Sequence, residues 1–157
     1  MAWSNSKIFS AFITDALNGT AAFDLDTDTI KVALYDNDIT PDQTVAAANT
    51  AYNAGQWAIS GNEVSQAGQW AAGGVALDNI ASGFSSNVYT FDDTNDTASG
   101  SAATLANVYG CLIYDDTLTT PVADQGICFN YFGGANSVTA GTLTVVWSAS
   151  GIFALTL

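Results

Sequence analysis

The stretch Ile30-Lys31-Val32-Ala33-Leu34-Tyr35 decides the fold class of this chain. Its isoleucine, valine and leucine recur at every second position, which predicts a β-strand with one apolar face. Asp36-Asn37-Asp38 follows directly and predicts the turn that ends this strand. Before residue 24 the apolar spacing is helical instead, so the chain changes from helix to strand between these two segments.

Upstream of this strand we predict a helix over residues 5–18. Ser4 or Asn5 would cap its start by accepting hydrogen bonds from the first-turn N–H groups, and Gly19 would end it in the left-handed conformation. The apolar residues that share one face of this helix are Ile8, Phe9, Phe12, Ile13, Ala16 and Leu17. That face predicts packing on a sheet, and docking on another chain is the alternative.

Downstream we predict a short second helix over residues 41–53. Thr40-Pro41-Asp42 combines a capping hydroxyl, a first-turn proline and an acid at the positive helix end. Seven segments of β character follow, at residues 57–64, 75–80, 86–91, 106–115, 125–132, 139–147 and 151–157. The last two would form a C-terminal hairpin around 148–151. The sequence therefore predicts one mainly β domain over residues 1–157, an antiparallel β-sandwich or open barrel with an N-terminal helix and a short second helix.

The composition limits the partners. The chain has 157 residues, 48% of them hydrophobic, so it can bury a core. Two lysines stand against fifteen acidic residues, and the net charge of −13 repels phosphate backbones and anionic lipids. We therefore expect no nucleic-acid and no membrane partner. The start of the chain lacks the basic region and apolar run of a signal peptide, which predicts synthesis in a host cytoplasm.

The sequence carries no recognisable catalytic motif. It has no histidine, and neither Lys7 nor Lys31 lies in a nucleophile motif. It also lacks a phosphate-binding loop and zinc-ligand spacing. We expect no enzymatic activity, no catalytic residues and no cofactor, and an aspartate-based hydrolase is the least favoured alternative.

Two acidic clusters raise the question of a metal. Asp24, Asp26 and Asp28 alternate like the first ligands of a calcium-binding loop, but Thr29 and Tyr35 occupy the positions where that loop needs glycine and an acid. The second cluster is residues 92–96. We expect solvated turns and no metal site, with a cation joining either cluster as the alternative.

Aromatic residues are the candidate interface residues. Trp147 fits a core position, whereas Trp57 and Trp70 lie among glycine, alanine and glutamine. Together with Trp3 and Phe9 they are predicted to contact another chain, or to stack on sugars. Cys111 and Cys128 are predicted to be free, buried thiols, although on neighbouring strands they would be able to face each other.

Seven segments occur in a recognisable order, namely the helix with Phe9 and Phe12, then 24–32, 39–42, 63–65, 72–77, 111–116 and 141–152. This order spans nearly the whole chain and resembles a family of small tailed-phage virion proteins, some of which look like capsid decoration or minor capsid proteins. The resemblance implies a structural protein without cofactor or catalytic residues, located in the virion on the outer surface of the head.

The leading hypothesis is therefore a capsid decoration (cement) or minor capsid protein that binds the outer head surface and stabilises it. Its partners would be the major capsid protein and further copies of itself; a homotrimer is expected from decoration proteins in general. The alternatives are a tail or tail-tip structural protein and a carbohydrate-binding module.

Overall fold

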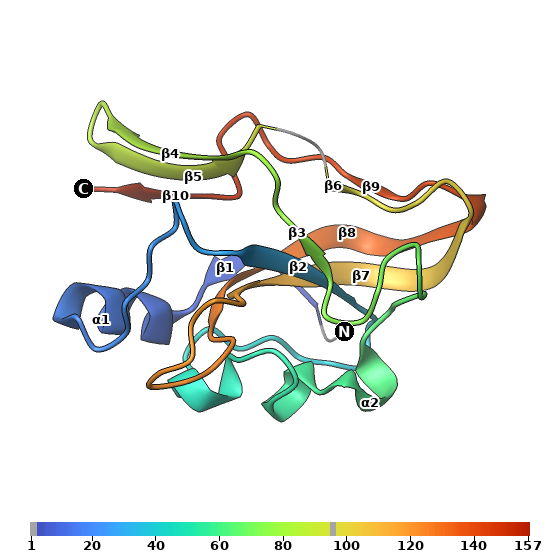
Figure 1. The fold of residues 1–157 in the computed structure, drawn as a ribbon, viewed down its shortest axis with the longest axis horizontal. Helices are drawn as coiled ribbons and strands as arrows, with labels where there is room; N and C mark the ends of the chain where they lie inside the picture. Colours follow the sequence, from blue (N-terminus) through green and yellow to red (C-terminus); the bar gives the residue numbers. More distant parts are fainter. Residues whose placement is uncertain (1–2, 95–96) are drawn as a thin grey trace.

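A computed structural model describes residues 3–94 and 97–157. Its centre is a five-stranded antiparallel sheet in the order β1-β8-β7-β2-β3. The strands are β1 (Lys7–Ile8), β2 (Ile30–Tyr35), β3 (Val75–Ala76), β7 (Ala103–Asp115) and β8 (Gly126–Gly141). The long strands β7 and β8 form the body of this sheet, with β2 alongside β7 (Figure 1).

A second layer lies over one face of the central sheet (Figure 1). It contains a three-stranded sheet in the order β10-β5-β4, made of β4 (Ile80–Ser85), β5 (Val88–Asp93) and β10 (Phe153–Thr156). It also contains the pair β6 (Thr97–Ala98) and β9 (Thr144–Val145). The prediction of a mainly β, antiparallel sandwich-like fold with an N-terminal helix is confirmed.

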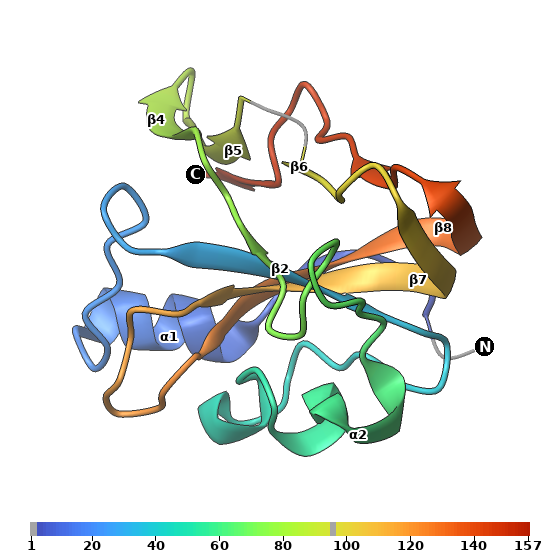
Figure 2. The ribbon, with the colours of Figure 1, turned by 45° about the vertical axis from the view of Figure 1, so that its right-hand side comes forward.

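The segment between β2 and β3 covers the opposite face of the central sheet (Figure 2). It holds two 3₁₀ turns, η1 (Ala47–Asn49) and η2 (Gly55–Trp57), and the four-residue helix α2 (Ile59–Asn62). We call residues 47–63 the covering segment. Helix α1 (Ser10–Asn18) packs near β8 at one end of the sheet.

The N-terminal helix is shorter than predicted. Residues 7–8 form β1 and pair with Cys128 and Phe129, so α1 begins only at Ser10, without a side-chain cap. Its end is as predicted, because Gly19 has a φ of 65° and its N–H donates to the carbonyl of Ala16.

The helix predicted over 41–53 is wrong, and only the 3₁₀ turn η1 forms there. One physical reason is local: the Asp42 carboxylate accepts hydrogen bonds from the Thr44 N–H and hydroxyl, 2.8 and 2.7 Å away, which competes with helical bonding. The strand predicted over 57–64 is also wrong. Gly61 has a φ of 98°, which interrupts any extended run there.

The predicted C-terminal hairpin is wrong as well. The turn exists, since the Gly151 N–H donates to the Ser148 carbonyl, but its two arms pair elsewhere. β9 pairs with β6, and β10 pairs with β5 from Phe153 opposite Phe91. Burial of these two phenylalanines, whose rings lie 5.3 Å apart, favours the distant partner over the adjacent one.

The two cysteines lie on the neighbouring strands β7 and β8 and are free and buried. Their register is diagonal, with Cys111 opposite Asn130 and Cys128 opposite Ile113. Burial raises the pKa of both thiols well above its usual range. The prediction of free, buried thiols is therefore confirmed.

Candidate functional site

The four predicted interface residues lie in the core instead. Trp3 is 1% exposed, and Phe9, Trp57 and Trp70 are fully buried within the single chain. In the folded protein none of them offers surface to a partner, so their assignment to an interface is wrong. The small residues beside Trp57 and Trp70 allow close packing inside the protein and do not mark an exposed patch.

Trp57 is at the centre of an aromatic cluster between the central sheet and the covering segment. Its ring lies 5.0 Å from Tyr35, 6.0 Å from Trp3 and 6.1 Å from both Phe9 and Phe129. The covering segment seals this cluster, and the Tyr35 hydroxyl donates to the Trp57 carbonyl at 2.8 Å. The cluster explains the high aromatic content by packing.

Exposed apolar side chains occur away from this cluster, in a groove that we call the α1–β10 groove. This groove has a volume of about 490 Å³ and lies between α1, the turn at residues 23–26 and the sheet of β10. Leu17 and Leu157 line it and are 82% and 84% exposed. The other apolar or aromatic side chains that line it are Phe12, Ile13, Ala16, Phe23, Leu25, Tyr89, Phe153 and Leu155.

The floor and the rim of the α1–β10 groove differ in chemistry. Phe12 packs edge-on against Phe23 and Phe153 at 4.8 and 6.0 Å, which forms an apolar floor. Asp24 and Asp26 lie on the rim and are exposed. The groove can therefore accept apolar side chains, and its rim favours basic or neutral groups next to them.

The 24–29 turn that forms one wall of this groove is fixed by its own acids. The Asp28 carboxylate accepts the Asp24 N–H at 2.8 Å, and Asp24 accepts the Asp26 N–H at 3.2 Å. Asp26 also accepts the Ser82 hydroxyl of β4. The alternating aspartates thus serve as turn-forming hydrogen-bond acceptors.

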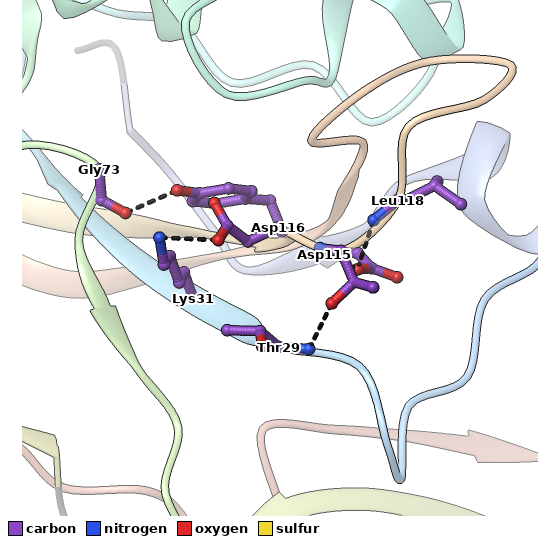
Figure 3. A network of polar contacts seen from close by, with 8 residues as sticks. Thr29, Lys31, Gly73, Asp115, Asp116 and Leu118 are labelled. Carbon is purple, nitrogen blue, oxygen red and sulfur yellow. Dashed lines mark hydrogen bonds and ion pairs between the residues drawn. The ribbon is translucent and has the colours of Figure 1, made fainter.

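Beyond the turn, the backbone is bound to the end of β7 (Figure 3). The Thr29 N–H donates to the Thr117 hydroxyl at 2.8 Å, and the Asp116 N–H donates to the Thr29 carbonyl at 2.9 Å. Lys31 forms an ion pair with Asp116, with Nζ 2.8 Å from Oδ2. Both charged groups are partly exposed, so this pair contributes only a few tenths of a kcal/mol.

Asp115 is the buried member of this region. Its Oδ1 accepts the N–H groups of Thr117 and Leu118 at 2.9 and 3.0 Å (Figure 3). Within residues 3–94 and 97–157, Oδ2 has no donor while Asp115 is ionised, and it faces the Asp28 carboxyl. Burial, with the hydrogen bond to Asp28, raises the pKa of Asp115 to about 6. Below that pH, the protonated Asp115 donates to Asp28.

The described residues contain no cluster of three or more side chains suited to hold a metal. Of the second acidic run at 92–96, residues 95 and 96 lie outside the described ranges. The described helices also include none that is long and apolar enough to cross a membrane.

Glu63, the single glutamate of the sequence, fastens the end of the covering segment. Its two carboxylate oxygens accept the Tyr52 hydroxyl at 3.0 Å and the Gly73 N–H at 2.8 Å. Partial burial raises its pKa. Tyr114 stacks on Tyr52 at 4.9 Å and donates to the Gly73 carbonyl at 2.6 Å, so the carboxylate is part of a structural network.

A second groove, the β8–β9 groove, lies between β8 and the segment at residues 142–152 that carries β9. It has a volume of about 700 Å³, and Tyr131, Phe132 and Trp147 line it. Sequence reasoning missed this groove and the α1–β10 groove, since it sought exposed sites among the tryptophans with small neighbours. The one usable signal was Leu17, which extends the apolar face of α1 to the last turn of the helix.

No protein-family model, curated protein or solved structure matches the chain.

Proposed function

We propose that this chain is a non-enzymatic structural protein of a tailed-phage virion, a capsid decoration or minor capsid protein that binds the outer surface of the head and stabilises it. The virion context comes from the order of segments in the sequence. The observation that carries the binding role is the α1–β10 groove, with Leu17 and Leu157 exposed at its edge. A groove of this kind favours association with another chain.

The chemistry of the groove defines the partner surface. Burying one exposed leucine contributes about 1.5–3 kcal/mol, so Leu17 and Leu157 together supply a substantial part of a docking energy. The acidic rim at Asp24 and Asp26 favours a partner that presents apolar side chains next to lysine or arginine. We propose that the major capsid protein presents this surface.

The net charge favours the outside of the particle. A protein of charge −13 is repelled by packaged DNA and is better placed on the outer surface of the head. Many copies on a symmetric shell multiply weak contacts into firm attachment, and assembly as a homotrimer would increase this effect.

The test is a comparison of Leu17→Asp with wild-type protein on purified particles that lack this protein. Wild-type protein should co-sediment with heads in many copies per particle, counted by quantitative mass spectrometry and located by electron microscopy. Leu17→Asp should reduce occupancy at least tenfold, because it places a charge in the apolar contact. Ile59→Asp changes an exposed apolar residue on the covering segment and should keep wild-type occupancy.

A few copies confined to the tail would refute the head position and favour a tail or tail-tip structural role. Head binding that is equally strong for Leu17→Asp and wild type would show that the α1–β10 groove is not the docking surface.

A further inference from the structure

The β8–β9 groove differs in chemistry from the proposed docking surface. Its walls are β8 of the central sheet and the segment from 142 to 152 in the second layer, which Figure 1 shows as separate layers. The volume of about 700 Å³ lies within the range of small-ligand sites in proteins.

Every side chain that lines this groove is uncharged. The α1–β10 groove, in contrast, includes Asp24 and Asp26. The net charge of −13 repels an anionic ligand, and the uncharged groove offers no cationic side chain to compensate for this repulsion. A neutral ligand is not repelled. The groove therefore favours neutral ligands over anionic ones.

Aromatic rings lie on both walls of the groove. On β8, Tyr131 stacks on Trp3 on the face that the covering segment covers, so the next residue, Phe132, presents its ring on the opposite face, toward the groove. On the other wall, the Trp147 Nε1–H donates to the Thr97 hydroxyl at 3.2 Å. The Phe132 and Trp147 rings are only partly buried, so both offer apolar surface to a ligand, and the hydrogen bond to Thr97 holds the Trp147 ring in place before binding.

Amides and hydroxyls lie between the rings. Asn130 and Asn136 line the groove from β8, and Thr142 and Thr144 line it from the opposite wall. The Asn130 amide lies at the long distance of 3.5 Å from the Ile152 carbonyl, so it retains capacity to bond a ligand. These groups can both donate and accept, which matches sugar hydroxyls.

An extended peptide fits this wall less well. Regular pairing along β8 needs an uninterrupted strand edge, but Gly133 and Gly134 have φ values of 80° and 156°. The register with β7 shifts across the same stretch, between the pairs Val108–Asn136 and Gly110–Tyr131. The irregular edge cannot offer a continuous ladder to an added strand.

We propose that the β8–β9 groove binds a neutral oligosaccharide, with Phe132 and Trp147 stacking on sugar rings and the amides and hydroxyls bonding their hydroxyl groups. This inference is independent of the proposed docking through the α1–β10 groove. It also replaces the buried Trp57 and Trp70 by partly exposed rings as the candidate sugar platform.

The test is isothermal titration calorimetry of the whole chain with five neutral hexasaccharides: maltohexaose, cellohexaose, laminarihexaose, mannohexaose and chitohexaose. Hexagalacturonate serves as the anionic comparison. At least one neutral sugar should bind with a Kd of about 1 mM or tighter. Hexagalacturonate should bind at least tenfold more weakly than that sugar.

Variants then locate the binding. Trp147→Ala should weaken it at least tenfold by removing one ring. Val146→Asp should weaken binding similarly, because it adds a charge to the groove. Val146 is 70% exposed, so this substitution should have little effect on folding. Ile59→Asp, outside both grooves, should bind like wild type. Thermal melting of each variant identifies any loss of binding that comes from unfolding.

Three results would overturn the proposal. These are no binding of any of the five neutral sugars, equal binding by wild type and folded Val146→Asp, and tighter binding of hexagalacturonate than of the neutral sugars. Loss of sugar binding in Val146→Asp with head occupancy intact would separate this site from the docking groove.

Discussion

The aromatic cluster around Trp57 and the α1–β10 groove are both apolar, yet they have opposite exposure. The cluster lies under the covering segment, and Trp3, Phe9 and Trp57 are at most 1% exposed. The groove has no such cover, and Leu17 and Leu157 at its edge are more than four-fifths exposed. The position of a covering loop, and not the kind of apolar residue, decides which surface a partner can reach.

The largest expected effect comes from emptying the covered cluster. Trp57→Ala should lower the free energy of unfolding by about 3–5 kcal/mol, because it leaves a large cavity among packed rings. Urea denaturation followed by circular dichroism measures this. A loss below about 1 kcal/mol would show that the covering segment does not seal the cluster.

Trp57→Phe is the matched control. It keeps a ring in the cluster and removes the Trp57 Nε1–H, which has no hydrogen-bond partner among the described residues. Phenylalanine leaves a small cavity, but it also removes the penalty of burying an N–H without a partner. The free energy of unfolding of this variant should therefore fall by less than about 2 kcal/mol.

The next effect comes from releasing the cover. Glu63→Ala removes the acceptor for Tyr52 and Gly73 and should lower the free energy of unfolding by about 2 kcal/mol. Glu63→Gln retains one oxygen acceptor and should lose about half as much. Hydrogen exchange should increase first within the covering segment, and exchange that increases uniformly along the chain would contradict this function of Glu63.

A smaller effect concerns the wall of the open groove. Because the pKa of Asp115 is raised to about 6 in the folded protein, its contribution to stability is complete below about pH 4 and is lost as the pH rises through 6. Between pH 4 and 7, the free energy of unfolding of the wild-type protein should therefore fall by about 1–2 kcal/mol more than that of Asp115→Asn. This corresponds to roughly 3–6 °C in melting temperature.

Asp115→Asn serves as the reference because its amide oxygen still accepts the N–H groups of Thr117 and Leu118, while its NH₂ donates to Asp28 at every pH. Parallel melting curves for the two proteins across this pH range would rule out the shared proton between Asp28 and Asp115.

The smallest effect on stability is expected in the open groove itself. Leu17→Asp and Leu157→Ser change side chains that are already exposed, so each should shift the free energy of unfolding by no more than about 0.5 kcal/mol. A loss above about 1 kcal/mol for either would mean that the groove is part of the packed core and not a free surface.

The sequence predicted the elements whose signal is local. The isoleucine, valine and leucine of β2 recur at every second position, and Gly19 ends α1 because glycine adopts a positive φ without strain. Partners could not be predicted in the same way, since β10 pairs with β5 although the turn at 148–151 pointed to β9. Pairing depends on which distant apolar faces become buried together.

The candidate sites were missed for the same reason. Trp57 and Trp70 have the same small neighbours whether or not another segment covers them, and that covering is a property of the folded chain. Asp28 and Asp115 are remote in sequence, so alternating aspartates looked like a solvated turn. Phe132 and Trp147 come to lie on the two walls of one groove only when β8 and the 142–152 segment are stacked.

The pairing of β1 with β8 has a consequence for the kinetics of folding. The Ser6 hydroxyl accepts the Tyr131 N–H across 125 positions of sequence, and Lys7 pairs with Phe129 beside it. The N-terminal strand must therefore wait for almost the whole chain to leave the ribosome before it can join its sheet. Contacts between residues so far apart in sequence are typical of chains that fold slowly, in milliseconds to seconds. Until β1 joins the sheet, the edge of β8 and the aromatic side chains stay uncovered.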